Sequence, residues 1–171
     1  DTENDNLAIG DQALGGAIAG GEYNVAIGNN SMAVLTSGDR NTGVGYNTLT
    51  SITSGNWNTA IGYEAGKAIT TGEYNAALGM FALSSNTTGR RNIALGGGSL
   101  GSNTSGNDNT ALGFDALYNN TTASYSIAIG YETLKGNTTG VRNLAIGKNA
   151  LDVADTENDN LAIGYDALGG A

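Results

Sequence analysis

The stretch Asn58–Leu83, NTAIGYEAGKAITTGEYNAALGMFAL, decides the fold, because it contains one complete 17-residue unit and the start of the next. The unit reads Asn-x-Ala-Ile-Gly-Tyr-x-Ala-Leu, followed by a polar segment such as Asn-Thr-Thr-Gly. A fixed period of this size is typical of repeat architectures and takes precedence over other sequence signals. We call each such unit a coil.

One glycine per coil, the anchor glycine, fixes the register of the array: Gly10, Gly28, Gly45, Gly62, Gly79, Gly96, Gly113, Gly130, Gly147 and Gly164. The first interval is 18 residues and the other eight are 17. We therefore predict one repeat array over residues 1–171. Because DTENDNLAIG occurs at both Asp1–Gly10 and Asp155–Gly164 without atypical capping repeats, we expect a fragment of a longer fibre.

The block before each anchor glycine alternates with the period of two that is typical of a β-strand. The residue one before the glycine is always Ile, Val or Leu, and the residue two before it is Ala in all coils but one. We expect a second short strand at the Ala-Leu pair after the glycine and a turn at the Asn-Thr-Thr-Gly segment. A helix is disfavoured, because no 3.6-residue period occurs and Gly, Thr and Asn are frequent.

The sequence thus predicts an all-β fold, a parallel β-solenoid (β-roll) of ten 17-residue coils. In-register stacking would place equivalent residues about 4.8 Å apart, so that each position forms a column along the rod. The position one before the glycine predicts a buried core column: Ile61, Leu78, Leu95, Leu112, Ile129 and Ile146. The position four before it predicts a hydrogen-bonded amide ladder: Asn41, Asn58, Asn75, Asn92 and Asn109.

The alanine column, two residues before the anchor glycine, has two interpretations. Either the interior of a tight single-chain coil admits only Ala, or another chain approaches this face closely. We favour the second interpretation, because a thin coil buries little apolar area per residue and gains from association. It predicts that chains associate, with possible inter-chain contacts at Ala60, Ala77, Ala94, Ala111, Ala128 and Ala145.

The composition disfavours several classes of function. The chain has no His and no Cys, which removes the usual transition-metal ligands and the commonest general base. We therefore expect no enzyme, and predict no catalytic residue, no metal site and no cofactor. A formal charge of −9 disfavours nucleic acid and anionic membrane surfaces as partners. No apolar run approaches the roughly 20 residues of a membrane span.

Four other patterns recur, and each has a structural and a functional interpretation. Aromatic residues after the glycine suit a ladder over the turn or, alternatively, sugar stacking. The threonines eight after the glycine suit turn chemistry or an ice-binding array. The acidic segments Asp1–Asp5 and Asp155–Asp159 suit solvated turns or a calcium site. The glycosylation pattern Asn-x-Thr/Ser recurs because the turn recurs. The residues that follow the glycine are Tyr46, Tyr63, Met80, Phe114, Tyr131 and Tyr165. The threonine column runs from Thr36 to Thr138, and the glycosylation pattern begins at Asn86, Asn103, Asn120 and Asn137.

The units NTAIGYEAG (58–66), NTALGFDAL (109–117) and NLAIGYDAL (160–168), separated by NTTG-type turns, resemble the repeats of phage tail-fibre and related surface proteins. Their Asn-x-Ala-Ile-Gly core is also similar to the head repeats of trimeric autotransporter adhesins of the YadA type, although those repeats are usually shorter. The resemblance covers all ten units. It implies a trimer of parallel β-rolls on a virion or a cell surface.

From the array and this resemblance we expect a structural and adhesive fibre segment of a phage tail fibre or a bacterial surface adhesin. Its location would be extracellular. Its partners would be further copies of the chain and a glycan or protein receptor on a host surface. The alternative is an ice-binding or carbohydrate-binding β-solenoid module, which would use one flat face.

Overall fold

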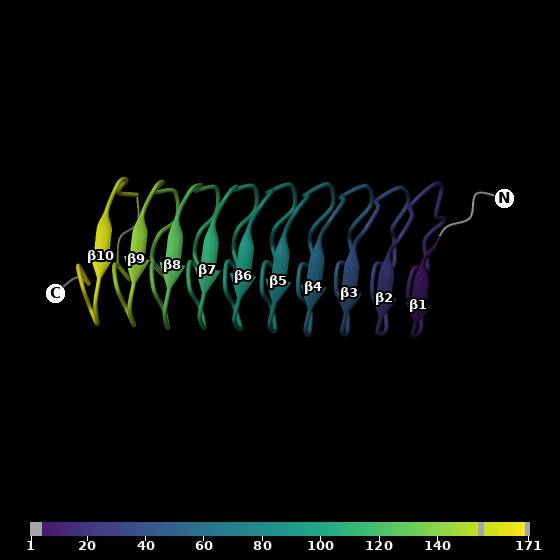
Figure 1. Cartoon of the computed structure of the whole chain (residues 1–171), viewed down its shortest axis with the longest axis horizontal. Coiled ribbons are helices and arrows are strands. Elements are labelled where there is room, and N and C mark those ends of the chain that lie inside the picture. Colours follow the sequence, from purple (N-terminus) through teal and green to yellow (C-terminus); the bar gives the residue numbers. More distant parts are fainter. Residues whose placement is uncertain (1–4, 154–155, 170–171) are drawn as a thin grey trace.

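The computed structural model describes residues 5–153 and 156–169 and shows an all-β rod (Figure 1). Ten strands of three residues form one sheet in sequence order, and each pairs in parallel with the next. They are β1 (Leu7–Ile9), β2 (Val25–Ile27), β3 (Thr42–Val44), β4 (Thr59–Ile61), β5 (Ala76–Leu78), β6 (Ile93–Leu95), β7 (Thr110–Leu112), β8 (Ile127–Ile129), β9 (Leu144–Ile146) and β10 (Leu161–Ile163).

The register joins equivalent residues of successive coils. Ala60 pairs with Ala77, and Ala77 pairs with Ala94, so that every position of the unit forms a column. The predicted β-solenoid with one coil per 17 residues is confirmed.

The predicted second strand of each coil is wrong. Residues three and four after the anchor glycine lie in a turn in every coil. The residue four after it has a left-handed backbone conformation, with φ of 50° at Leu83, 53° at Leu117 and 53° at Leu134. A positive φ interrupts a strand and disfavours β-branched side chains. This explains why the position carries Leu or Met in every coil except the one with Gly66, and never Ile or Val, while the strands carry all of these aliphatic types except Met.

The anchor glycine ends each strand for a related reason. Its φ lies between 126° and 139° from Gly28 to Gly164, a region that side-chain-bearing residues rarely adopt. A Cβ on Gly45 would lie 2.5 Å from the carbonyl oxygen of Gly62 in the next coil. Glycine is therefore required here by both the backbone conformation and the approach of the neighbouring coil.

The predicted core column is also wrong, because its side chains point outward. Ile61, Leu78 and Leu112 are 39%, 42% and 41% exposed. The remaining members, Leu95, Ile129 and Ile146, are half-buried.

The alanine column, in contrast, is buried inside the single chain in every coil after the first, so the predicted inter-chain contact at these residues is corrected as well. The members Ala60, Ala77, Ala94, Ala111, Ala128 and Ala145 all have at most 1% exposure. Of the two interpretations, the tight single-chain coil is the one that the structure shows.

The reason is the cross-section of the coil. At Gly66, which replaces the leucine four after the anchor, an added Cβ would lie 3.0 Å from Leu49, 3.1 Å from Ile69 and 3.5 Å from Ala60. Three segments thus meet at the centre of the coil, and two of them already contribute large aliphatic side chains. The inward residue of the strand must therefore be small, and the larger strand residues face outward.

Candidate functional site

The predicted asparagine ladder is confirmed and is fully buried. Asn58 Nδ2 donates to Oδ1 of Asn41 (3.1 Å) and to the carbonyl of Gly72 (2.9 Å), and the Asn58 backbone N–H donates to the same Oδ1 (3.0 Å). The same pattern joins Asn75, Asn92 and Asn109. The ladder is a structural element that satisfies buried amides along the rod.

A second asparagine ladder, which the sequence reasoning missed, lies seven residues after the anchor glycine. Asn103 Nδ2 donates to Asn86 Oδ1 (2.8 Å), and Asn120 Nδ2 donates to Asn103 Oδ1 (2.8 Å). These asparagines and Asn137 are the ones that match the glycosylation pattern, and all four are 0% exposed. Their side chains hold the coils together and are not accessible for modification in the folded chain. The signal that could have found them is their 17-residue spacing.

The threonine column forms a third ladder. The hydroxyl of each threonine from Thr36 to Thr121 donates to the carbonyl of the threonine one coil later, for example Thr70 to Thr87 at 3.1 Å and Thr87 to Thr104 at 3.0 Å. The hydroxyl protons of these residues are therefore committed to neighbouring coils rather than displayed to solvent. This observation favours the structural interpretation of the column over an ice-binding array.

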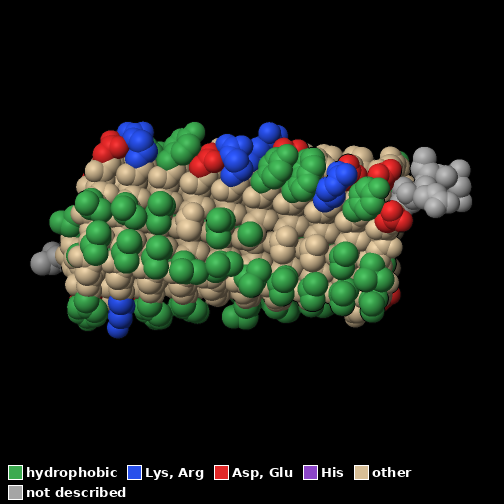
Figure 2. All heavy atoms as spheres, in the orientation of Figure 1, with side chains coloured by type: hydrophobic (Ala, Val, Ile, Leu, Met, Phe, Trp, Pro, Cys, Tyr) green, Lys and Arg blue, Asp and Glu red, His purple; other side chains and the backbone are tan. Residues whose placement is uncertain are grey.

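The outer face of the sheet exposes aliphatic side chains along the rod, among them Ile61, Leu78 and Leu112. The first and third residues of each strand point outward, whereas the middle residue is buried in β2 to β10. Figure 2 shows rows of hydrophobic side chains along the rod on this face, while charged side chains collect mainly along one border. We call the surface formed by these first and third strand residues the outer strand face.

The predicted aromatic ladder after the anchor glycine is confirmed in part of its length. The rings of Tyr46 and Tyr63 stack at 5.4 Å, and those of Phe114 and Tyr131 stack at 5.6 Å. Lys148 continues this column, because its Nζ lies 5.6 Å from the ring centre of Tyr131 and 5.7 Å from that of Tyr165.

A further exposed column lies at the charged border, five residues before each anchor glycine. Here the Arg40 guanidinium lies over the rings of Tyr23 and Trp57, and Trp57 stacks on Tyr74 at 4.9 Å. Later in the same column, Arg91 forms a bidentate ion pair with Asp108: Nε donates to Oδ1 at 2.6 Å and Nη2 donates to Oδ2 at 2.8 Å. The hydrogen bonds and charge of Arg91 hold the pKa of Asp108 below its ordinary value.

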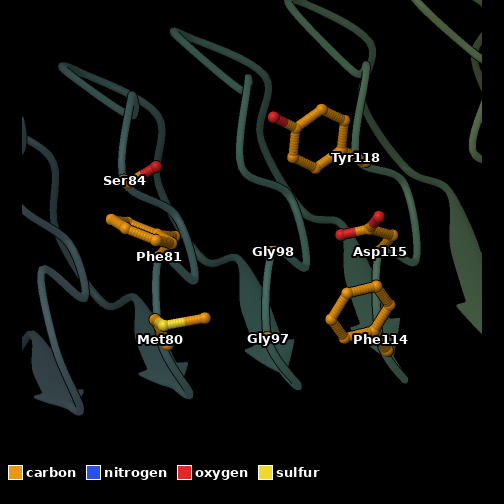
Figure 3. Close-up of a pocket in the computed structure, with 8 residues that line it drawn as sticks. All are labelled: Met80, Phe81, Ser84, Gly97, Gly98, Phe114, Asp115 and Tyr118. Atoms are coloured by element: carbon orange, nitrogen blue, oxygen red, sulfur yellow. The ribbon is translucent and has the colours of Figure 1, made fainter.

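One coil interrupts the aromatic column and leaves a notch in the surface. In this coil, which we call the glycine coil, Gly97, Gly98 and Gly101 replace the larger side chains that adjacent coils carry at the same positions. Figure 3 shows the notch between two walls: Met80, Phe81 and Ser84 of one coil, and Phe114, Asp115 and Tyr118 of the other. The notch has a volume of about 420 Å³.

The wall at Asp115 combines a fixed carboxylate with aromatic rings. Asp115 Oδ2 pairs with Lys135 Nζ at 3.3 Å, and Lys135 also binds Glu132 at 2.7 Å. Hydrogen bonding to Glu132, together with the contact to Asp115, raises the pKa of Lys135 despite partial desolvation. The other oxygen, Asp115 Oδ1, lies over Gly98, where any Cβ would collide with it. The absence of a side chain at Gly98 is therefore what leaves room for this carboxylate.

Among residues 5–153 and 156–169, no group of three or more Asp or Glu side chains is placed to hold a metal ion. Of the two acidic segments, residues 1–4 and 155 lie outside the described residues. No helix in the described part of the chain is long and apolar enough to cross a membrane.

Comparisons of the chain with protein-family models, with curated proteins and with solved structures find no match.

Proposed function

We propose that the chain is a rigid structural segment of a surface fibre, and that it functions as a homotrimer packed through the outer strand face. The observation that supports this proposal is the outward direction of the aliphatic strand residues along the whole sheet. Soluble monomers rarely expose contiguous apolar patches of more than a few hundred Å². The third residue is aliphatic in every described strand, whereas the first is Thr in β3, β4 and β7. This continuous aliphatic column is expected to be covered, and further copies of the same rod have the matching length and repeat.

The rod itself suits a spacing function. Ten coils at a strand spacing of about 4.8 Å give a length of roughly 50 Å. Parallel backbone pairing joins each coil to the next, and the first amide ladder runs along the same stack. The threonine ladder from Thr36 to Thr138 and the second amide ladder from Asn86 to Asn137 add further hydrogen bonds over part of the rod, so that bending requires many hydrogen bonds to open together. A fibre of a phage tail or a bacterial adhesin, as the resemblance of the repeats implies, needs such a stiff extracellular segment to present receptor-binding parts.

The oligomeric mass in solution tests the proposal. Light scattering is expected to give about three times the 17.2 kDa of one chain. Leu112→Asp places a charge at the centre of the outer strand face and is expected to reduce the mass to that of the monomer. The matched control is Thr122→Asp, which places the same charge on an exposed turn and is expected to leave the mass unchanged.

A wild-type chain that is folded by circular dichroism but monomeric at micromolar concentration would overturn the trimer. A stable dimer would retain the outer strand face as an interface but would refute the threefold arrangement. Cell-surface binding by the intact fibre, compared with the Leu112→Asp chain, would then test whether adhesion depends on assembly.

A further inference from the structure

We propose that the notch at Gly97 and Gly98 binds one neutral hexopyranose ring of a surface glycan. The proposal rests on the notch alone and does not depend on the trimer. The notch lies beyond the end of β6, beside the outer strand face rather than within it.

The shape of the notch follows from the solenoid. Its walls belong to coils on either side of the glycine coil, so they are separated by two strand spacings, roughly 10 Å. Removing one coil's side chains therefore leaves space for about one ring between the walls. The volume of about 420 Å³ lies within the range of about 300–1,000 Å³ that is typical of small-molecule sites.

The walls have the surfaces that a sugar ring requires. Phe114, Phe81 and Met80 present apolar faces against which the C–H groups of a pyranose can pack. The Phe114 ring leans over Gly97, within 3.4 Å of where a Cβ would lie. Because Phe114 is also stacked on Tyr131, its ring is supported from the side away from the notch.

Polar groups at the rim match the hydroxyls of a sugar. Asp115 Oδ1 faces the notch, whereas Oδ2 is the oxygen that pairs with Lys135. The Ser84 hydroxyl donates to the Gly101 carbonyl at 3.2 Å, which leaves its oxygen as an acceptor. The Tyr118 hydroxyl, which Figure 3 shows pointing across the glycine coil, can both donate and accept.

The charges around the notch favour a neutral ligand. Asp115 already has the cation Lys135 on its other oxygen, so it needs hydroxyl donors rather than an ionic partner. An anionic ligand would meet the Asp115 carboxylate, within a chain of net charge −9. An apolar side chain from a second copy would cover the Asp115 carboxylate without donating to it, which is unfavourable.

Saturation-transfer difference NMR on the intact chain tests the site with four probes: the methyl pyranosides of glucose, galactose, mannose and N-acetylglucosamine. At least one is expected to receive saturation, whereas glucuronate and choline, as anionic and cationic controls, are not. Gly97→Tyr fills the notch with the residue that this column carries elsewhere and is expected to abolish the signal. Gly97 does not have a positive φ, so its backbone accepts a side chain.

The matched control is Asn29→Tyr, which adds the same ring to the same column four coils away and is expected to leave the signal intact. Asp115→Asn keeps the shape of the wall and is expected to weaken binding several-fold without changing the oligomeric mass. The proposal is overturned if no pyranoside responds, if only choline or glucuronate responds, or if the signal persists in Gly97→Tyr. It is also overturned if Gly97→Tyr lowers the oligomeric mass while no sugar binds, because a second copy would then occupy the notch.

Discussion

Ala111 and Leu112 are neighbours in β7, and their side chains lie on opposite sides of the sheet: Ala111 is fully buried and Leu112 is 41% exposed. The smaller residue is in the core, and the larger one faces outward. This relationship recurs at equivalent positions along the rod. It predicts that substitutions at the buried position change the stability of one chain, whereas substitutions at the outward position change the proposed association between chains.

Ala111→Leu is expected to lower the free energy of unfolding by about 1–3 kcal/mol, because extra methylene groups cannot fit inside the coil. Chemical denaturation in the Leu112→Asp background, which is expected to be monomeric, measures this effect without a contribution from the proposed assembly. Leu112→Ala in the wild-type chain provides the comparison. It is expected to weaken association while leaving the unfolding of the separated chain within about 0.5 kcal/mol. Equal effects of the two substitutions on unfolding would contradict the buried position of Ala111.

Leu117→Ile is expected to destabilise the chain, although the two side chains have the same size. Leu117 is buried and has a φ of 53°, a conformation that a β-branched residue adopts at a cost of about 1–3 kcal/mol. The matched substitution Leu112→Ile lies in a strand and is expected to be neutral. Thermal unfolding of the two variants side by side makes the comparison, and an unchanged midpoint for Leu117→Ile would argue against the left-handed turn.

Asn92→Ala is expected to be among the most destabilising single substitutions in the chain. It removes the acceptor for both the backbone N–H and Nδ2 of Asn109, and the donor to the Gly106 carbonyl. Each buried group left without a partner costs about 1–3 kcal/mol. Asn119→Ala, at an exposed turn position, is the control and should change the unfolding free energy by less than about 0.5 kcal/mol. Similar denaturation midpoints for the two variants would refute the ladder.

Stability is expected to fall at acid pH as the ion pair of Arg91 and Asp108 is lost. The pKa of Asp108 is depressed below its ordinary value of 3.8 in the folded chain, so the unfolded chain binds the proton more readily. The stabilisation is therefore present above pH 3.8 and disappears as the pH falls through the lower folded pKa. Asp108→Asn should remove this part of the pH dependence. Unfolding midpoints measured between pH 2 and pH 6, with the exposed Asp5→Asn as control, test the expectation, and identical pH profiles for the two variants would contradict it.

The sequence by itself determined the period, the parallel in-register stacking and the first asparagine ladder. These follow from local regularities, because a 17-residue repeat with one glycine register leaves a single way to align equivalent residues. The alternation before each anchor glycine also indicated correctly that the residues one and two before it occupy opposite sides of a strand.

Which of those sides is the interior was decided only by the tertiary structure. Ile61 is the more apolar residue and was predicted to be buried, but Ala60 is buried instead. The interior of one coil is shared with residues from two other segments, such as Leu49 and Ile69, and these fill the available width. The alternation of a strand contains no information about that width, because it is set by side chains elsewhere in the coil and by the left-handed turns that direct Leu83 and its equivalents inward.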